Sequence, residues 1–227
     1  MIPQPSHSGF FGKVVSRGDF VRRRLPDDFI TCWDDWLQRS MEASRLQLGE
    51  EWLNAYLSAP LWRFTIGTGI CGDVPRLGVM MPSVDRVGRH FPLTIAAVAD
   101  PLRTDLEQLS GVGGWFDAIE EIALSALNKE FSLNEMDAAL LALSLPQAEE
   151  TALPIYSALP DGKNIAAALS GIATTLTRIA PAQHSLWWTD GSGLVEPCML
   201  AYRALPPASA FAAMMTGLWT MENHTDA

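Results

Sequence analysis

Two apolar runs joined by a charged connection constrain the fold of this 227-residue chain more than any other feature. Residues 77–81 alternate apolar and smaller side chains, and residues 93–99 form an apolar, partly β-branched run that is typical of a buried strand. The connection is about ten residues long, whereas most hairpin loops take about two to five. Because long polar loops on rigid strands often carry function, this connection is the first candidate for a site.

Further segments show the apolar periodicity of helices or strands. A helix is expected to begin at Pro26–Asp28, where proline and two carboxylates suit a first turn, and to end near Leu48, before Gly49. Other helices are predicted over residues 50–57, 115–126, 132–143 and 165–179 and after Pro207. Other strands are predicted within residues 9–20 and over residues 60–66, 154–159, 185–189 and 194–202.

The strands at 60–66, 77–81 and 93–99 follow one another through short connections, which predicts antiparallel pairing. We therefore expect an α+β fold with a central, mainly antiparallel sheet and helices packed on its faces. No segment resembles a linker, so a single domain is expected over residues 1–227, with flexible tails at residues 1–8 and 221–227. The order of the strands does not follow from the sequence.

The net charge of −10 at pH 7 limits the classes of partner. It repels nucleic acid and anionic membranes, so an anion-binding role would need a local basic patch such as Arg22–Arg24. No apolar segment reaches the roughly 18 residues of a membrane helix, and the N-terminus lacks the pattern of a signal peptide. The expectation is a cytoplasmic protein with no nucleic-acid partner and no membrane insertion.

Cysteine and histidine spacing predicts neither a metal site nor a disulfide. The three cysteines, Cys32, Cys71 and Cys198, lie far apart and form no Cys-x-x-Cys pair, which favours reduced thiols in the core. The four histidines have no paired spacing. No metal and no cofactor are therefore expected.

The best enzyme constellation in the sequence is Ser83, Asp85 and His90. A hydrolytic triad needs the base within about 3 Å of the nucleophile and the acid behind the base. Residues so close in sequence rarely meet these demands, and no Gly-x-Ser-x-Gly motif accompanies them. The structural interpretation is that Asp85 pairs with Arg86 or Arg89 and orders the loop.

Arg86 and Arg89 allow two interpretations, and the residues by themselves leave both open. A guanidinium group can grip a carboxylate or phosphate with two hydrogen bonds, which favours a binding surface. The same side chains could instead hold Asp19 or Asp85 within the protein and brace the fold.

Several separated motifs, most of them before residue 93, carry a resemblance to a known family. They are Gly9–Lys13, Arg17–Phe20, Arg24–Pro26, Trp33–Leu37, Pro60–Phe64, Pro82–Arg89 and Ser185–Thr189. In this order they resemble the TagF family, also called ImpM, which is associated with bacterial type VI secretion.

The resemblance implies a non-enzymatic cytoplasmic accessory protein that represses assembly of the secretion apparatus after translation, by binding a forkhead-associated-domain scaffold. Candidate residues for partner binding or loop ordering lie in loops within the densest motifs. They are Asp19, Ser83, Asp85, Arg86 and Arg89. Two alternatives stand beside this hypothesis, a hydrolase using Ser83, His90 and Asp85 and a structural adaptor without a regulatory role.

Overall fold

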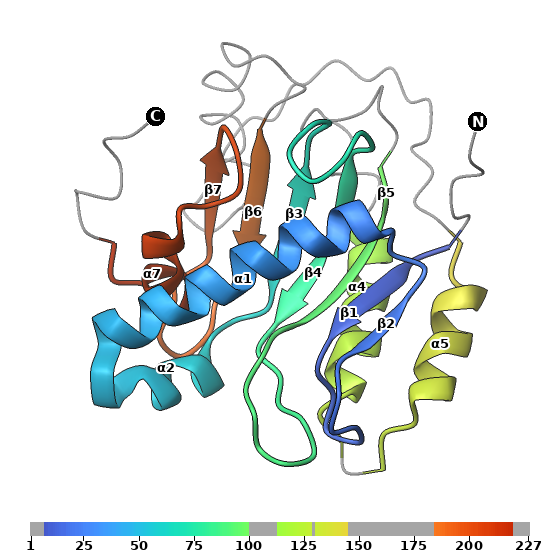
Figure 1. Ribbon diagram of the computed structural model, residues 1–227, viewed down its shortest axis with the longest axis horizontal. Helices are drawn as coiled ribbons and strands as arrows, with labels where there is room; N and C mark the ends of the chain where they lie inside the picture. Colours follow the sequence, from blue (N-terminus) through green and yellow to red (C-terminus); the bar gives the residue numbers. More distant parts are fainter. Residues whose placement is uncertain (1–6, 100–112, 129, 145–183, 220–227) are drawn as a thin grey trace, which may run out of the picture.

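A computed structural model describes residues 7–99, 113–128, 130–144 and 184–219 of the chain. These residues form a seven-stranded sheet in the order β2-β1-β5-β4-β3-β6-β7, and all neighbouring strands pair antiparallel (Figure 1). The strands are β1 (Gly9–Gly12), β2 (Val21–Arg23), β3 (Trp62–Ile66), β4 (Arg76–Met81), β5 (Leu93–Val98), β6 (Ser185–Thr189) and β7 (Cys198–Tyr202). The predicted α+β fold with a mainly antiparallel sheet is confirmed.

Helices α1 (Asp27–Leu48), α2 (Trp52–Ser58) and α7 (Phe211–Thr216) cover one face of the sheet (Figure 1). Short 3₁₀ turns, Gly49–Glu51 and Ala208–Ala210, precede α2 and α7. Their core is aromatic, because the buried rings of Trp33 and Trp187 stack with centroids 5.7 Å apart. This packing anchors the long helix across the middle of the sheet.

Local sequence signals explain the bounds of α1. Pro26 is extended and precedes the helix, and Asp27 and Asp28 occupy its first turn, where they complement the helix dipole. Gly49 ends the helix with a positive φ of 52°, a conformation that glycine adopts without steric cost. Both predicted ends of this helix are confirmed.

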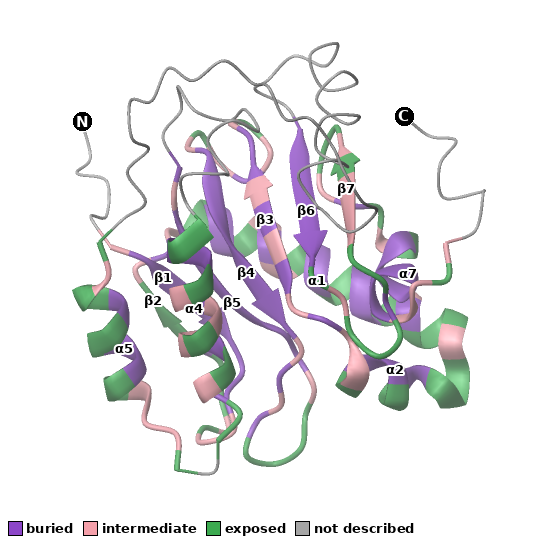
Figure 2. Ribbon diagram, turned by 180° about the vertical axis from the view of Figure 1, so that it is seen from behind, coloured by how far each residue is buried: buried purple, intermediate pink, exposed green. Residues whose placement is uncertain are grey.

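Helices α4 (Gly113–Ser125) and α5 (Leu133–Ala142) lie on the opposite side (Figure 2). The apolar side of α4 contributes Phe116 and Ile119 to a second core. The predicted cap of α5 is present, since the Ser132 hydroxyl accepts a hydrogen bond from the amide of Glu135. The sheet is therefore covered on both faces.

The structure refines the remaining predictions. Strand β7 begins at Cys198 rather than near residue 194, and Leu218 lies beyond α7 and is exposed. The strand predicted at 154–159 and the helix predicted at 165–179 lie outside the described residues. So do most of the predicted tails, although Ser8 is buried and its carbonyl oxygen accepts a hydrogen bond from Arg24.

The prediction of three reduced cysteines is wrong, because Cys32 and Cys71 form a disulfide. The two residues are 39 positions apart in sequence, yet α1 meets the β3–β4 loop and their Cα atoms lie 5.5 Å apart. Sequence spacing could not reveal a pair that only tertiary packing brings together. Cys198 is a free, partly buried thiol, and burial raises its pKa to about 11.

The sequence also predicted that the chain has no membrane-spanning helix. Within the ranges that the structure describes, no helix combines the length and apolar character needed to cross a bilayer.

Candidate functional site

Two loops that are distant in sequence meet beside the same end of the sheet and form the candidate site. They are residues 13–20, between β1 and β2, and residues 82–92, between β4 and β5, and we call them together the two-loop site (Figure 1). The amide of Arg86 donates to the carbonyl oxygen of Arg17 at 2.9 Å. The Ser83 hydroxyl donates to the carbonyl oxygen of Lys13 at 2.7 Å. Backbone atoms therefore fix each loop against the other.

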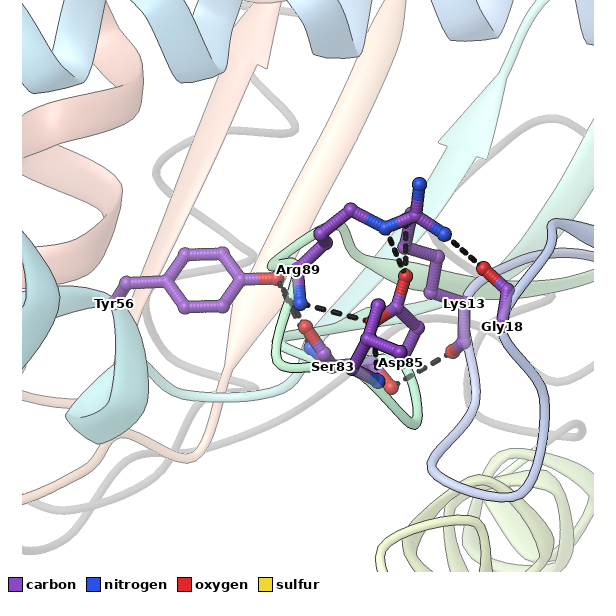
Figure 3. Close-up of polar contacts among 7 residues, drawn as sticks. Lys13, Gly18, Tyr56, Ser83, Asp85 and Arg89 are labelled. Atoms are coloured by element: carbon purple, nitrogen blue, oxygen red, sulfur yellow. Dashed lines mark hydrogen bonds and ion pairs between the residues drawn. The ribbon is translucent and has the colours of Figure 1, made fainter.

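A buried ion pair lies at the centre of the two-loop site. The Lys13 ammonium contacts Asp85 Oδ2 at 2.5 Å, and the side chains of Lys13 and Asp85 are only 6% and 0% exposed. The Arg89 guanidinium donates to the same oxygen at 2.7 Å and also to the carbonyl oxygen of Gly18 (Figure 3). One carboxylate thus holds a cation from each loop.

Backbone amides complete the coordination of Asp85. Its Oδ1 accepts hydrogen bonds from the amides of Val87 and Arg89, at 3.0 and 2.9 Å. Burial alone would raise the pKa of Asp85, but the hydrogen bonds from Lys13, Arg89 and Val87 outweigh it and hold that pKa well below its usual range. Asp85 is therefore ionised and orders the loop that carries it.

Tyr56 of α2 supports the two-loop site from the side. Its phenol donates to the carbonyl oxygen of Ser83 at 2.9 Å and accepts from the amide of Ser83 at 3.0 Å (Figure 3). Burial raises the pKa of this phenol, which stays protonated. The edge-to-face contacts of the His90 ring are with Trp52 and Tyr56. These contacts attach the loop at 82–92 to the helical layer.

The arrangement does not assemble the hydrolytic triad that the sequence raised as an alternative. The Ser83 hydroxyl is buried and donates to Lys13, and the Asp85 carboxylate is engaged by Lys13 and Arg89. Among the described residues, no hydrogen bond joins Ser83 to His90. A nucleophile without a base in reach lacks the geometry that acyl transfer requires.

The outer part of the two-loop site is solvent-exposed. Asp19 and Arg86, two of the predicted site residues, lie there, together with Arg17. They border a shallow hollow of about 250 Å³, which is lined by Ser16, Arg17, Gly18, Asp19, Phe20, Val21 and Arg86. Phe20 is 47% exposed and Val87 is 66% exposed, although both belong to ordered loops.

The structure thus divides the predicted site residues into two groups. Ser83 and Asp85 are buried, and Arg89 binds the Asp85 carboxylate from the surface with 59% of its side chain exposed, whereas Asp19 and Arg86 face solvent and take no part in this network. Asp85 pairs with Arg89, as one interpretation expected. Asp85 also pairs with Lys13, whose side chain is more deeply buried than that of Arg89 and which sequence reasoning did not select. Lys13 follows the first strand directly, and no spacing rule distinguishes a buried lysine from an exposed one.

Two exposed residues of the two-loop site were also missed by sequence reasoning. Arg17 belongs to an Arg-Gly-Asp tripeptide that recurs by chance, and Phe20 fits the apolar pattern of a core residue. The sequence signal that could have identified them is that both residues lie within two positions of Asp19, in the same short loop.

A larger open groove of about 680 Å³ lies between α4 and α5. Three glutamates and several apolar side chains line it, namely Glu121, Glu130, Glu135, Ile122, Phe131 and Met136. Within the described residues, no cluster of histidine, cysteine or carboxylate side chains could hold a metal ion.

Comparisons with known proteins place the two-loop site in a recognised sequence region. Residues 9–143 match the family model of the TagF N-terminal domain, described as type VI secretion system-associated. Among solved structures, PA0076 from Pseudomonas aeruginosa PAO1 is 39% identical, with a TM-score of 0.77, over 94% of this chain and 96% of that chain. A comparison with curated proteins gives no match. Both loops of the site lie inside the residues that the family model covers.

Proposed function

Because this chain belongs to the TagF family of type VI secretion-associated proteins, we propose that it represses assembly of the secretion apparatus after translation. In this proposal it binds a forkhead-associated-domain scaffold and keeps it from the assembling machine, as the resemblance to TagF, or ImpM, proteins implies. Sequestration needs a stable binding surface and no chemistry.

The single observation that carries the proposal is the structure of the two-loop site. Its buried half fixes both loops, and its outer half presents Arg17, Phe20 and Arg86 to solvent. Arginine and aromatic side chains are enriched in protein interfaces and in their energetic hot spots. A surface whose shape is already fixed before binding loses less entropy when the partner docks.

A non-catalytic role also fits the polar groups of the site. The groups that could act as nucleophile, base and acid are engaged with other partners or stand apart from one another. We therefore propose binding in preference to hydrolysis, and no cofactor or metal is required.

The proposal places the protein in the cytoplasm, where reductants keep most thiols reduced. Cys32 and Cys71 would then be thiols in the cell, and their disulfide would describe the oxidised protein. The bond joins α1 to the β3–β4 loop and includes no residue of the two loops of the site. Repression by scaffold binding does not depend on it.

The test is direct binding of the purified chain to the cognate scaffold by calorimetry, together with a secretion assay in cells that lack the gene. We expect a stoichiometric complex, increased secretion in the deletion strain and repression when the gene is restored. The variant Arg17→Ala/Arg86→Ala should lose both binding and repression at an unchanged melting temperature, whereas Arg203→Ala should retain both. Absence of a complex with the scaffold would refute the proposal, and a complex without an effect on secretion would favour a structural adaptor.

A further inference from the structure

We propose that the hollow between Arg17 and Arg86 receives a carboxylate side chain from an acidic segment of the partner protein, beside an apolar anchor on Phe20. This inference rests on the proposed function, because it specifies the chemistry of the same interface. Sequence reasoning selected Arg86 as a candidate, but it did not select Arg17 or Phe20.

The two guanidinium groups are available for a partner. Arg17 and Arg86 are exposed and line the same hollow, and among the described residues neither side chain has a hydrogen-bond or ion-pair partner. Arg22 and Arg39 are also exposed, but each is engaged within the protein, since Arg22 pairs with Asp27 and Arg39 pairs with Asp35. Two free guanidiniums at one hollow suit an oxyanion, which can accept paired hydrogen bonds from each.

The backbone beneath these arginines is held before any partner arrives. The amide of Arg17 donates to the carbonyl oxygen of Val14, and its own carbonyl oxygen accepts from the amide of Arg86. The carbonyl oxygen of Gly18, the residue after Arg17, accepts a hydrogen bond from the guanidinium of Arg89, which Asp85 fixes in turn (Figure 3). The positions from which both arginines project are therefore set by the buried network.

The charge balance of the two-loop site is opposite to that of the whole protein. The chain carries a net charge of −10, but the site brings together four cations, Lys13, Arg17, Arg86 and Arg89, and two carboxylates, Asp19 and Asp85. Asp85 is fully engaged inside, so among the described residues that line the hollow Asp19 is the one carboxylate. A local positive surface on an acidic protein selects an acidic partner and orients its approach.

The apolar part of the surface is also ordered. The Phe20 ring stacks on Phe11 with centroids 5.5 Å apart and meets the edge of Phe91 at 4.8 Å. The Lys13 ammonium lies 5.0 Å from the centroid of the same ring. Half of this aromatic side chain is nevertheless exposed beside the hollow, which makes it a rigid anchor for an apolar side chain next to the carboxylate.

The experiment measures the dissociation constant and the association rate for scaffold binding to the 227-residue chain, at low and at high salt, and compares the wild type with the variant Arg17→Glu/Arg86→Glu. We expect at least a roughly 100-fold weaker affinity and loss of most of the salt dependence. Arg203→Glu, which reverses an exposed charge beyond β7, is the matched control and should change affinity by less than about threefold. Melting temperatures of all variants should equal that of the wild type, because the exchanged side chains are exposed.

The affinity of the variant Asp19→Asn for the scaffold shows whether the bound segment is acidic or basic. An acidic segment should bind this variant as tightly as the wild type or more tightly, whereas a basic segment should bind it more weakly. Phosphatase treatment of the scaffold should leave binding unchanged, because the anion is a carboxylate; a loss would assign the hollow to a phosphate group and overturn the inference. Wild-type affinity in the charge-reversed variant would overturn the inference while leaving scaffold binding intact, whereas no binding by the wild-type chain would overturn the proposed function as well.

Discussion

The inner and outer halves of the two-loop site use the same residue types for different purposes. Inside, Lys13, Asp85 and Arg89 satisfy one another and the surrounding amides. Outside, the side chains of Arg17 and Arg86 have no hydrogen-bond or ion-pair partner among the described residues. The difference shows that charged residues within one short motif can be divided between stability and recognition, so that substitutions in the two halves should have separable effects.

Removal of the Asp85 carboxylate is expected to have the largest effect on stability. Asp85→Ala leaves the Lys13 ammonium buried without a counter-ion and frees two loop amides. The free energy of unfolding should fall by about 3–5 kcal/mol, as it does when one partner of a buried ion pair is removed. Urea denaturation measures the change. The exposed Asp19→Ala is the matched control, and an equal loss in both variants would remove the distinction between the halves.

Reduction of the disulfide should change the stability of the fold without changing the affinity of the two-loop site for the scaffold. The Cys32–Cys71 bond closes a loop between residues 39 positions apart, so its loss should lower the free energy of unfolding by about 2–4 kcal/mol. Cys32→Ser and reduced wild type should behave alike in urea denaturation. Scaffold affinity should not change, and a parallel loss of affinity would connect the β3–β4 loop to the interface.

Removal of the Tyr56 hydroxyl tests the support that α2 gives to the inner half. Tyr56→Phe keeps the ring but leaves the amide and the carbonyl oxygen of Ser83 without this partner. The expected loss is about 1–2 kcal/mol in chemical denaturation, since the buried Ser83 amide loses this partner, whereas the Ser83 carbonyl oxygen still accepts from the amide of Phe91. Ser83→Ala, which removes only the hydroxyl bonded to Lys13, provides a comparison from the same residue. No change in either variant would mean that solvent replaces these bonds.

Acid should weaken the inner half selectively. The pKa of Asp85 is held below its ordinary value of about 3.9, so the carboxylate contributes its full stability above that pH and loses it as the pH falls toward the folded-state pKa. The stability difference between wild type and Asp85→Asn should therefore narrow between about pH 5 and about pH 2. Denaturation curves at each pH measure it. A constant difference would show that the ionised form is not responsible.

Substitution in the outer half is expected to have the smallest effect on stability. Arg86→Ala removes an exposed side chain with no ion pair among the described residues, so the free energy of unfolding should change by no more than about 0.5 kcal/mol. A calorimetric melt measures this. A loss comparable to that of Asp85→Ala would make Arg86 part of the structural network.

Local rules in the sequence predicted the elements better than they predicted the site. The ends of α1 followed from Pro26 and Gly49, and the antiparallel strands around the second loop followed from short connections. The order of the seven strands and the Cys32–Cys71 bond depend on contacts between distant segments, which no local pattern contains.

The same limit applies to the site residues. The sequence located the charged loop at 82–92 but not the loop at 13–20 that faces it, although Asp19 was selected there. Which charges are paired depends on this meeting of loops, so Lys13 and Asp85 could not be distinguished from Arg17 and Arg86 by residue type. The family resemblance supplied the role of a binding protein, which spacing and composition did not contain.

Hydrogen exchange of the chain, alone and with its scaffold, tests the central claim most directly, because it maps the interface without any substitution. Scaffold binding should slow exchange in peptides that cover residues 14–21 and 84–90 and leave the groove between α4 and α5 unchanged. Protection confined to that groove or to another surface, with the two loops exchanging as in the free protein, would contradict the assignment of the interface to the two-loop site.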